Sequence, residues 1–191
     1  MTNSSASGGY LAPTSAAPPF DDPFDQFLHD VIVGITGLAG NLVMPRWQPV
    51  IPRHPEVTVN WCAVGVLSVE DVGTKSQVTH NPAGTIVAAN DGSDIVRPVE
   101  RVISLVSMYG PAAWGNIGLL RDGLRVEQNR AALRAAGVGL ESTGPRRVAS
   151  DIAPQLVARR RVDMELVMVR LVSRTYPVYN LLSAQSLIHP N

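Results

Sequence analysis

The sequence is poor in the residues that mark disulfide-linked, secreted and membrane-spanning proteins. It has a single cysteine, Cys62, so no disulfide can form within the chain, as is usual in a reducing compartment. No Lys or Arg precedes Arg46, so the basic start of a signal peptide is missing. The longest mostly apolar run, Val31–Gly40, is far shorter than the roughly 20 residues of a membrane helix. We therefore expect a soluble protein made in a cytoplasm.

Aromatic residues and lysine are also scarce. Aromatics make up only 5% of the chain, so a core built from its 45% hydrophobic residues must be largely aliphatic. Lys75 is the only lysine, and all other basic residues are arginine. Arginine is favoured at interfaces because its planar head makes bidentate contacts. A GC-rich genome gives the same bias, so both explanations stay open.

Opposite charges collect at opposite ends of the sequence. The formal net charge is +0, which gives no global attraction to nucleic acid or to an anionic membrane. Residues 1–45 nevertheless hold four Asp and no basic residue, whereas residues 97–191 hold thirteen Arg against seven acidic residues. This separation suits head-to-tail self-association, and it suits charges that pair within one folded chain equally well.

The most informative segment is Gln155–Thr175. From Val162 to Met168 every even position is apolar, and the odd positions from Arg159 to Glu165 are charged, which is typical of a strand with one dry and one wet face. After Leu166 apolar residues also hold the odd positions of 167–171. This change of phase indicates a β-bulge, or a strand that leaves one environment for another.

The predicted strand is too long for a compact domain. At about 3.3 Å per residue it would span roughly 65 Å, whereas a domain of this length is about 40 Å across. The strand must therefore bend sharply or extend beyond its own domain. The second possibility points to a protein that works in an assembly.

The rest of the chain predicts a mixture of helices and strands. Asp22 and Pro23 form a helix start, and apolar residues follow at helical spacing to about Thr36, before Gly37. Two further helices are expected at 111–124 and 127–136, and a loop is expected between residue 144 and the long strand. The predicted shorter strands are 57–69, 76–80, 85–89, 95–108 and 138–143.

This order predicts an α+β fold. We expect a mostly antiparallel sheet, with helices packed on one face and one long strand near the carboxyl end. Residues 1–20, rich in Ser, Ala, Gly and Pro, are expected to form a flexible arm. Residues 21–176 would then form a single domain, and 177–191 a tail.

No arrangement typical of a cofactor or metal site is found. Gly34, Gly37 and Gly40 end a predicted helix, whereas a dinucleotide-binding loop needs different spacing between a strand and a helix. The four histidines are spread out without metal-ligand spacing. We expect no cofactor and no metal.

Catalysis and nucleic-acid binding have weak support. Cys62 lies within a predicted strand without a nucleophile signature, so we interpret it as a small buried hydrophobe. Asp163 and Glu165 resemble a carboxylate pair, but the flanking Arg159 and Arg161 make ion pairing the simpler explanation. The clusters 146–147 and 159–161 lack the interleaved aromatics of a nucleic-acid site, so solvated faces or protein contacts are favoured. We expect no catalytic residue.

Several short stretches together carry a resemblance to a known family. They are Val33–Gly37, Arg46–Pro49, Asn60–Ala63, Tyr109–Gly110, Leu120–Leu124, Gln128–Arg130, Arg160–Asp163 and Arg174–Pro177. Their order and spacing, over roughly Phe24 to Leu187, resemble the bacteriophage neck and tail-terminator family, the tail-completion proteins of long-tailed phages.

The resemblance implies a sheet flanked by helices and a structural, non-enzymatic role in the virion. It implies a homohexameric ring that ends the tail tube, faces the head connector and passes DNA through its lumen. Expected partners are other copies of the chain, tail tube and any sheath subunits, and proteins of the connector and portal. Expected interface residues are Asp22, Asp25, Asp30, Arg159, Arg161, Asp163, Glu165, Val167 and Arg170. Another tail or connector subunit, a small enzyme and an arginine-dependent nucleic-acid binder remain as alternatives.

Overall fold

The computed structural model describes residues 9–17, 19, 21–48, 55–72, 77–81, 92–152 and 158–178, with the backbone alone at 77–79, 81, 150–152 and 158–159. The chain divides into two compact units, which are described separately. The smaller unit comprises Met1–Pro18, Gly73–Val99 and Val172–Asn191, and the larger comprises Pro19–Val72 and Glu100–Leu171. The division into an arm at 1–20, one domain at 21–176 and a tail at 177–191 stays a prediction.

A six-stranded sheet forms the centre of the larger unit. Its strands are β1 (Val43–Pro45), β2 (Trp61–Asp71), β5 (Val99–Tyr109), β6 (Val138–Thr143), β7 (Arg147–Ile152) and β8 (Ala158–Leu171). Their order is β1-β2-β5-β8-β6, and β7 also pairs with β8. β1 runs parallel to β2, whereas the pairings of β2 with β5 and of β8 with β6 and β7 are antiparallel.

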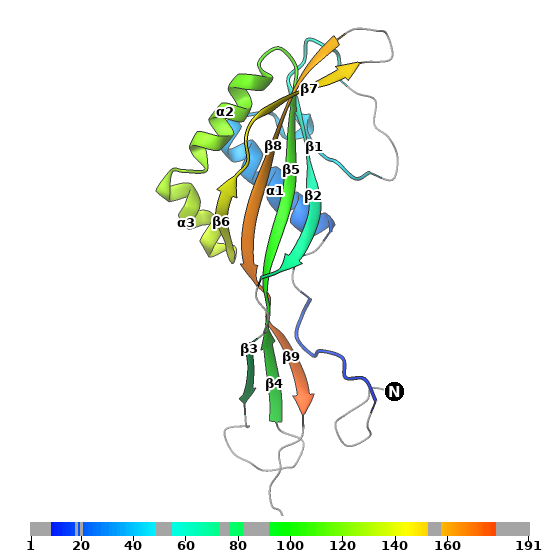
Figure 1. The fold of residues 1–191 in the computed structure, drawn as a ribbon, viewed down its shortest axis with the longest axis vertical. Coiled ribbons are helices and arrows are strands. Elements are labelled where there is room, and N and C mark those ends of the chain that lie inside the picture. Colours follow the sequence, from blue (N-terminus) through cyan, green and yellow to red (C-terminus); the bar gives the residue numbers. More distant parts are fainter. Residues whose placement is uncertain are drawn as a thin grey trace, which may run out of the picture. The chain divides into compact units, whose positions relative to one another are not determined.

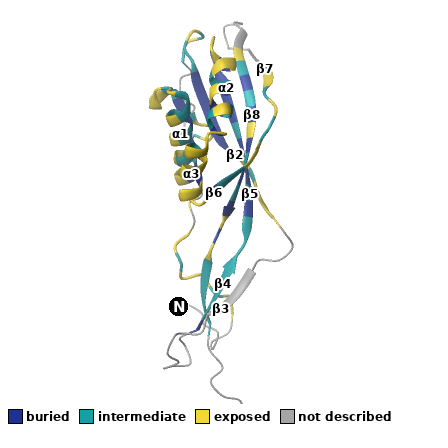
Figure 2. Cartoon of the chain, turned by 90° about the vertical axis from the view of Figure 1, so that its left-hand side faces the viewer, coloured by how far each residue is buried: buried dark blue, intermediate teal, exposed yellow. Residues whose placement is uncertain are grey.

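Three helices of the larger unit lie on one face of this sheet (Figures 1 and 2). They are α1 (Asp22–Thr36), α2 (Ala113–Gly123) and α3 (Glu127–Ala135), and a short 3-10 turn, η1 (Gly40–Leu42), leads into β1. The prediction of an α+β fold with a mostly antiparallel sheet and helices on one face is confirmed.

The core between sheet and helices is mostly aliphatic. The even positions from Val162 to Met168 in β8 are buried, as are Phe24, Leu28 and Ile32 in α1. Because strand side chains alternate between faces and helix residues repeat every three to four positions, these sets meet across one layer. We call the side of the sheet that faces the helices its inner face.

The first helix ends at the predicted residue, Thr36. It ends where Gly37 takes the left-handed conformation (φ 71°) and its N–H donates to the carbonyl oxygen of Val33. Its start differs by one residue from the prediction, because Asp21, and not Asp22, is the N-cap. Asp21 has φ 49° and makes no side-chain capping bond.

The change of side-chain face expected after Leu166 does not occur, whereas the other interpretation, a strand that leaves one environment for another, agrees with the passage of the chain into a second sheet after Leu171. Even positions stay buried through Arg170, which is 5% exposed, because its guanidinium pairs with Glu100 of β5 at 2.8 Å. A charged residue can occupy a core position when a buried counter-ion satisfies it. The irregularity lies on the neighbouring strand, where β6 shifts register between Leu140 and Ser142.

The predicted long strand is two strands in two sheets. β8 ends at Leu171, and β9 (Arg174–Val178) belongs to the three-stranded antiparallel sheet β3-β4-β9 of the smaller unit. The predicted strand 95–108 is likewise divided at Pro98 into β4 (Gly92–Arg97) and β5. Proline has no N–H to donate to a ladder, which accounts for this break.

The structure differs from the prediction in two further places. Residues 147–152 were expected in a loop but form β7, which pairs with β8. β3 (Gln77–Asn81) pairs with β4, whereas the predicted strand 85–89 and the tail from residue 179 lie outside the described residues. Within the expected arm, Thr14 donates its N–H to the carbonyl oxygen of Thr175 in β9 at 2.8 Å.

Candidate functional site

The described helices lie on one face of the six-stranded sheet (Figure 2), and the opposite face carries several apolar residues. Ile103 and Leu105 of β5 and Val167 and Val169 of β8 are only partly buried there, whereas their chain neighbours are buried on the inner face. Glu165 is exposed beside them. We call these five residues the open face.

Two ion pairs lie on the same side of the sheet as the open face. Arg101 of β5 reaches across β8 to Glu141 of β6 with two hydrogen bonds, of 2.8 and 2.9 Å. Arg161 holds Asp163 in the same two-bond manner on β8. Apolar side chains beside arginine and other polar groups are usual in a protein–protein interface.

The candidate interface residues fall on both sides of the sheet. Arg161, Asp163 and Glu165 occupy odd positions of β8, away from the helices, as predicted from the alternation. Val167 lies on the same side, which the expected change of phase did not predict. Arg159 lies in β8, but its side chain is outside the described residues. Sequence reasoning missed Ile103 and Leu105, although the alternation of segment 95–108 was visible, because nothing in that pattern says which face the helices cover.

Arg170 has a different position from the other candidates. Its guanidinium donates to Glu100 Oε2 and to the carbonyl oxygen of Pro19, and it lies 5.1 Å from the centre of the Phe24 ring. These contacts hold it inside the larger unit. It therefore offers little surface to a partner.

The acidic candidates lie on α1. Asp30 is exposed and accepts hydrogen bonds from Gln26 and His29. The hydrogen bond with His29 is the main reason that the pKa of Asp30 is lowered and that the pKa of His29 is raised. His29 is also held by the carbonyl oxygen of Gly40, at 3.0 Å.

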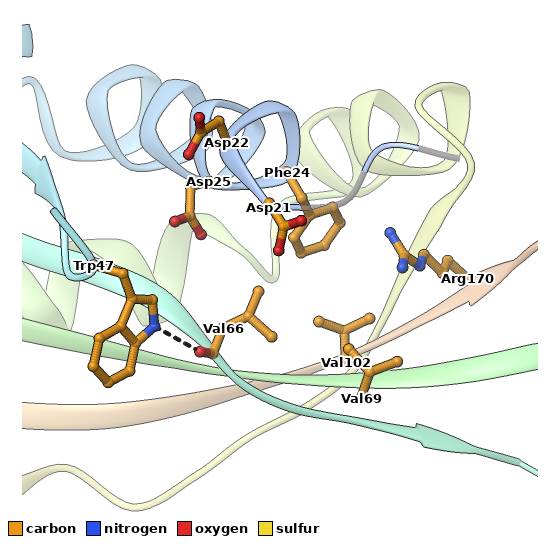
Figure 3. Close-up of a pocket in the computed structure, with 9 residues that line it drawn as sticks. All are labelled: Asp21, Asp22, Phe24, Asp25, Trp47, Val66, Val69, Val102 and Arg170. Carbon is orange, nitrogen blue, oxygen red and sulfur yellow. Dashed lines mark hydrogen bonds between the residues drawn. The ribbon is translucent and has the colours of Figure 1, made fainter. Parts of the chain in front are cut away.

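Asp22 and Asp25 border a cavity of ≈ 380 Å³ (Figure 3). Its lining residues are Asp21, Asp22, Phe24, Asp25, Trp47, Val66, Val69, Val102 and Arg170. Burial raises the pKa of Asp25, a hydrogen bond from the Val66 backbone opposes this, and the negative charges of Asp22 and Asp21 raise it further. Sequence reasoning identified the acidic helix but missed Trp47 and Val66, which join it only in the fold.

The residues considered for catalysis are poorly placed for it. Cys62 is fully buried, and burial raises the pKa of its thiol, whereas a nucleophilic cysteine needs a lowered pKa and access. Asp163 is engaged by Arg161. Among the residues that the structure describes, no group of three or more His, Cys, Asp or Glu could hold a metal ion.

Arginines of the two basic clusters contact their own chain. Arg146 lies over the Trp114 ring at 4.7 Å, and Arg160 donates to the carbonyl oxygen of Pro111 at 3.4 Å. These contacts favour a structural role over phosphate binding. Within the described part of the chain, no helix has the length and apolar content that crossing a membrane requires.

Comparison with known proteins identifies a family. A search of curated proteins found no match. The sequence model of the family described as phage neck terminator protein matches residues 22–189, which include the open face and every residue that lines the acidic cavity except Asp21. This chain therefore belongs to the phage neck terminator protein family.

Proposed function

We propose that copies of this chain form a ring, expected to be a hexamer, that ends the phage tail tube and joins it to the head connector. Membership of the neck terminator family supports a structural role in the phage neck. The partners in this proposal are other copies of the chain, tail tube and any sheath subunits, and connector or portal-associated proteins. DNA would pass through the lumen only as the genome, and assembly would occur in the host cytoplasm.

The observation that carries the proposal is the open face. Ile103, Leu105, Val167 and Val169 are apolar and only partly buried, on the side of the sheet away from the helices. When a neighbouring subunit removes such a surface from water, the free energy of the assembly falls. The ion pairs of Arg101 and Arg161 would form polar parts of that contact.

A closed ring with a head-to-tail contact needs two different surfaces on each copy. The open face and the acidic helix α1 meet this requirement, because they lie on opposite sides of the same sheet. In this proposal Arg159, Arg161, Asp163, Glu165 and Val167 belong to one contact. Asp22, Asp25 and Asp30 belong to or lie near the other. Arg170 is left out because it is buried.

A charge placed on the open face tests the proposal. Val167→Asp should keep the fold but abolish ring formation and binding to the ends of purified tail tubes, because the carboxylate would be buried in the contact. Val126→Asp is the matched control: Val126 is exposed before α3, where Asp is a favourable N-cap. Sedimentation velocity, circular dichroism and electron microscopy of tubes mixed with each protein give the readouts.

The expected result is that the wild type and Val126→Asp form rings on tube ends, while Val167→Asp remains a folded monomer. The proposal is wrong if Val167→Asp forms rings and caps tubes like the wild type. It is also wrong if the wild type neither forms rings nor binds tube ends.

A further inference from the structure

One edge of the six-stranded sheet is only partly paired. β1 pairs with Cys62, Ala63 and Val64 of β2 and then ends at Pro45. β2 continues to Asp71, paired only with β5 on its other side. From Val66 to Asp71 the outward edge of β2 therefore has no strand partner among the described residues. We call this segment the β2 edge.

Side chains occupy the place of a neighbouring strand at the start of the β2 edge. The Trp47 indole Nε1 donates to the carbonyl oxygen of Val66 at 3.0 Å (Figure 3), and the Asp25 carboxylate accepts a hydrogen bond from the Val66 backbone. The N–H and the C=O of Val66 thus both point away from β5. The register then shifts between Val66 and Ser68, which leaves Leu67 as a bulge.

The same orientation recurs at Val69. Along a strand, the direction of the N–H and C=O groups and the face of the side chain both alternate from one residue to the next. A bulge of one residue shifts both alternations by one position. Val69 lines the cavity as Val66 does, so its side chain also faces inward. Its N–H and C=O therefore point outward from the sheet. This provides a donor and an acceptor for an added strand.

The acidic cavity lies directly beside the β2 edge. Val66 and Val69 form its sheet side, and Asp21 and Asp25 point toward it from the start of α1 (Figure 3). The exposed Trp47 ring lies at its rim. Every second side chain of a strand added to the β2 edge would face inward, between the sheet and α1.

The charges around the cavity favour a cation. Three carboxylates, from Asp21, Asp22 and Asp25, meet there, and burial together with this mutual repulsion raises the pKa of Asp25. The arginine in the wall, Arg170, pairs with Glu100. An aromatic ring beside carboxylates suits the flat head of Arg or the ammonium of Lys. A volume of ≈ 380 Å³ is large enough to hold one long side chain.

We propose that the β2 edge pairs with an extended segment of a different polypeptide, which inserts an arginine or lysine side chain into the acidic cavity. This goes beyond the proposed ring, because it uses the edge of the sheet and does not use the open face.

A second copy of the chain fits this site poorly through its own edge strands. In β7, Val148 pairs with Val162, a residue of the inner face, whereas Arg147 pairs with Asp163 on the opposite face. If the inner faces of both copies lie on the same side, a sheet continued from the β2 edge into β7 of another copy brings Val148, and not Arg147, toward α1. In β6 the inward residues include Val138 and Leu140, which are apolar. Neither edge strand supplies the cation.

The first test identifies the occupant in assembled phage particles. Val69 is replaced by the photoreactive residue p-benzoylphenylalanine, particles are illuminated, and cross-linked peptides are sequenced by mass spectrometry. The expected cross-link joins position 69 to another virion protein, within two residues of an Arg or Lys. Cross-links only to further copies of this chain, or none in assembled particles, overturn the proposal.

The second test uses the cross-linked segment as a synthetic peptide and measures its binding to the purified protein by fluorescence anisotropy. Asp21→Asn combined with Asp25→Asn should weaken binding at least about tenfold. A peptide with norleucine in place of the basic residue should lose a similar factor. Asp30→Asn is the matched control, because Asp30 lies on the same helix but away from the cavity.

Equal binding by the wild type and the double variant overturns the proposal. Val69→Pro adds a test of main-chain pairing. It removes the outward N–H at an edge position, where proline is tolerated, and should also weaken peptide binding. Val167→Asp should leave peptide binding unchanged, so failure of the ring proposal and failure of this one give different results.

Discussion

The two faces of the six-stranded sheet are made by the same strands and have different surroundings. On the inner face Val162, Met164 and Leu166 are buried beneath helices, and even the charged Arg170 has a buried partner. On the other face Val167 and Val169 are apolar but only partly covered. The alternation of side chains along β8 places apolar residues on both faces of the sheet. The inner face therefore stabilises the folded chain, whereas the open face keeps apolar side chains partly exposed to solvent.

The largest effect should come from the inner ion pair. Arg170→Met leaves Glu100 buried without its counter-charge, and we expect the free energy of unfolding to fall by about 3–5 kcal/mol. Arg161→Met, which removes the pair with Asp163 on the opposite face, should cost about 1 kcal/mol or less. Urea unfolding of the isolated protein measures both.

A second replacement checks the cause of that loss. Adding Glu100→Gln to Arg170→Met should restore much of the stability, because the unpaired charge is then removed. If Arg170→Met and Arg161→Met lower the free energy of unfolding equally, the ion pair on the inner face does not contribute more stability than the one on the opposite face, and this prediction is wrong.

Apolar neighbours on β8 provide the next comparison. Leu166→Ala removes a fully buried side chain and should lower the free energy of unfolding by about 2–5 kcal/mol. Val167→Ala, one residue further on, should cost the isolated chain about 1 kcal/mol or less, because its side chain is partly exposed. Thermal and urea unfolding of the two variants at low concentration would test this. A larger loss from Val167→Ala would show that the open face is already covered in the monomer.

The helical layer offers a matched pair of glycines on α2. A Cβ at Gly123 would lie 2.3 Å from Ile35 Cγ2 of α1, so Gly123→Ala should destabilise the fold by about 1–3 kcal/mol. A Cβ at Gly115 would meet nothing within 4 Å, so Gly115→Ala should stabilise it by about 0.5–1 kcal/mol through helix propensity. Melting temperatures that move in opposite directions would confirm the close approach of α1 and α2.

The smallest expected effect is the pH dependence given by His29 at the outer surface of α1. Its pKa is raised, mainly by the hydrogen bond with Asp30, so the imidazolium stabilises the folded protein. This contribution should be complete below the ordinary pKa of about 6.5 and be lost as pH rises through the folded value. The stability difference between the wild type and His29→Gln should therefore shrink above neutral pH. Urea unfolding at several pH values, with an NMR titration of His29, measures it; a constant difference would contradict it.

The sequence predicted many elements because their signals are local. α1 follows from apolar spacing and from Gly37, whose left-handed conformation ends it. β6 has the predicted bounds, Val138–Thr143. β7 was missed because its pattern is short, and the phase error in β8 arose because Arg170 was assumed to need water. A buried counter-ion from β5 satisfied it instead, and that partner is distant in sequence.

The sequence by itself determined the α+β class, the dry and wet sides of residues 162–166 and the family, since these depend on local periodicity and on the order of short stretches. Only the tertiary structure decided which apolar residues stay partly exposed, that Arg170 pairs with Glu100, and that Asp25 and Trp47 meet at Val66 of β2. These features depend on strand order and on which face the helices cover. Both are set by contacts between residues far apart in the chain, which local patterns do not encode.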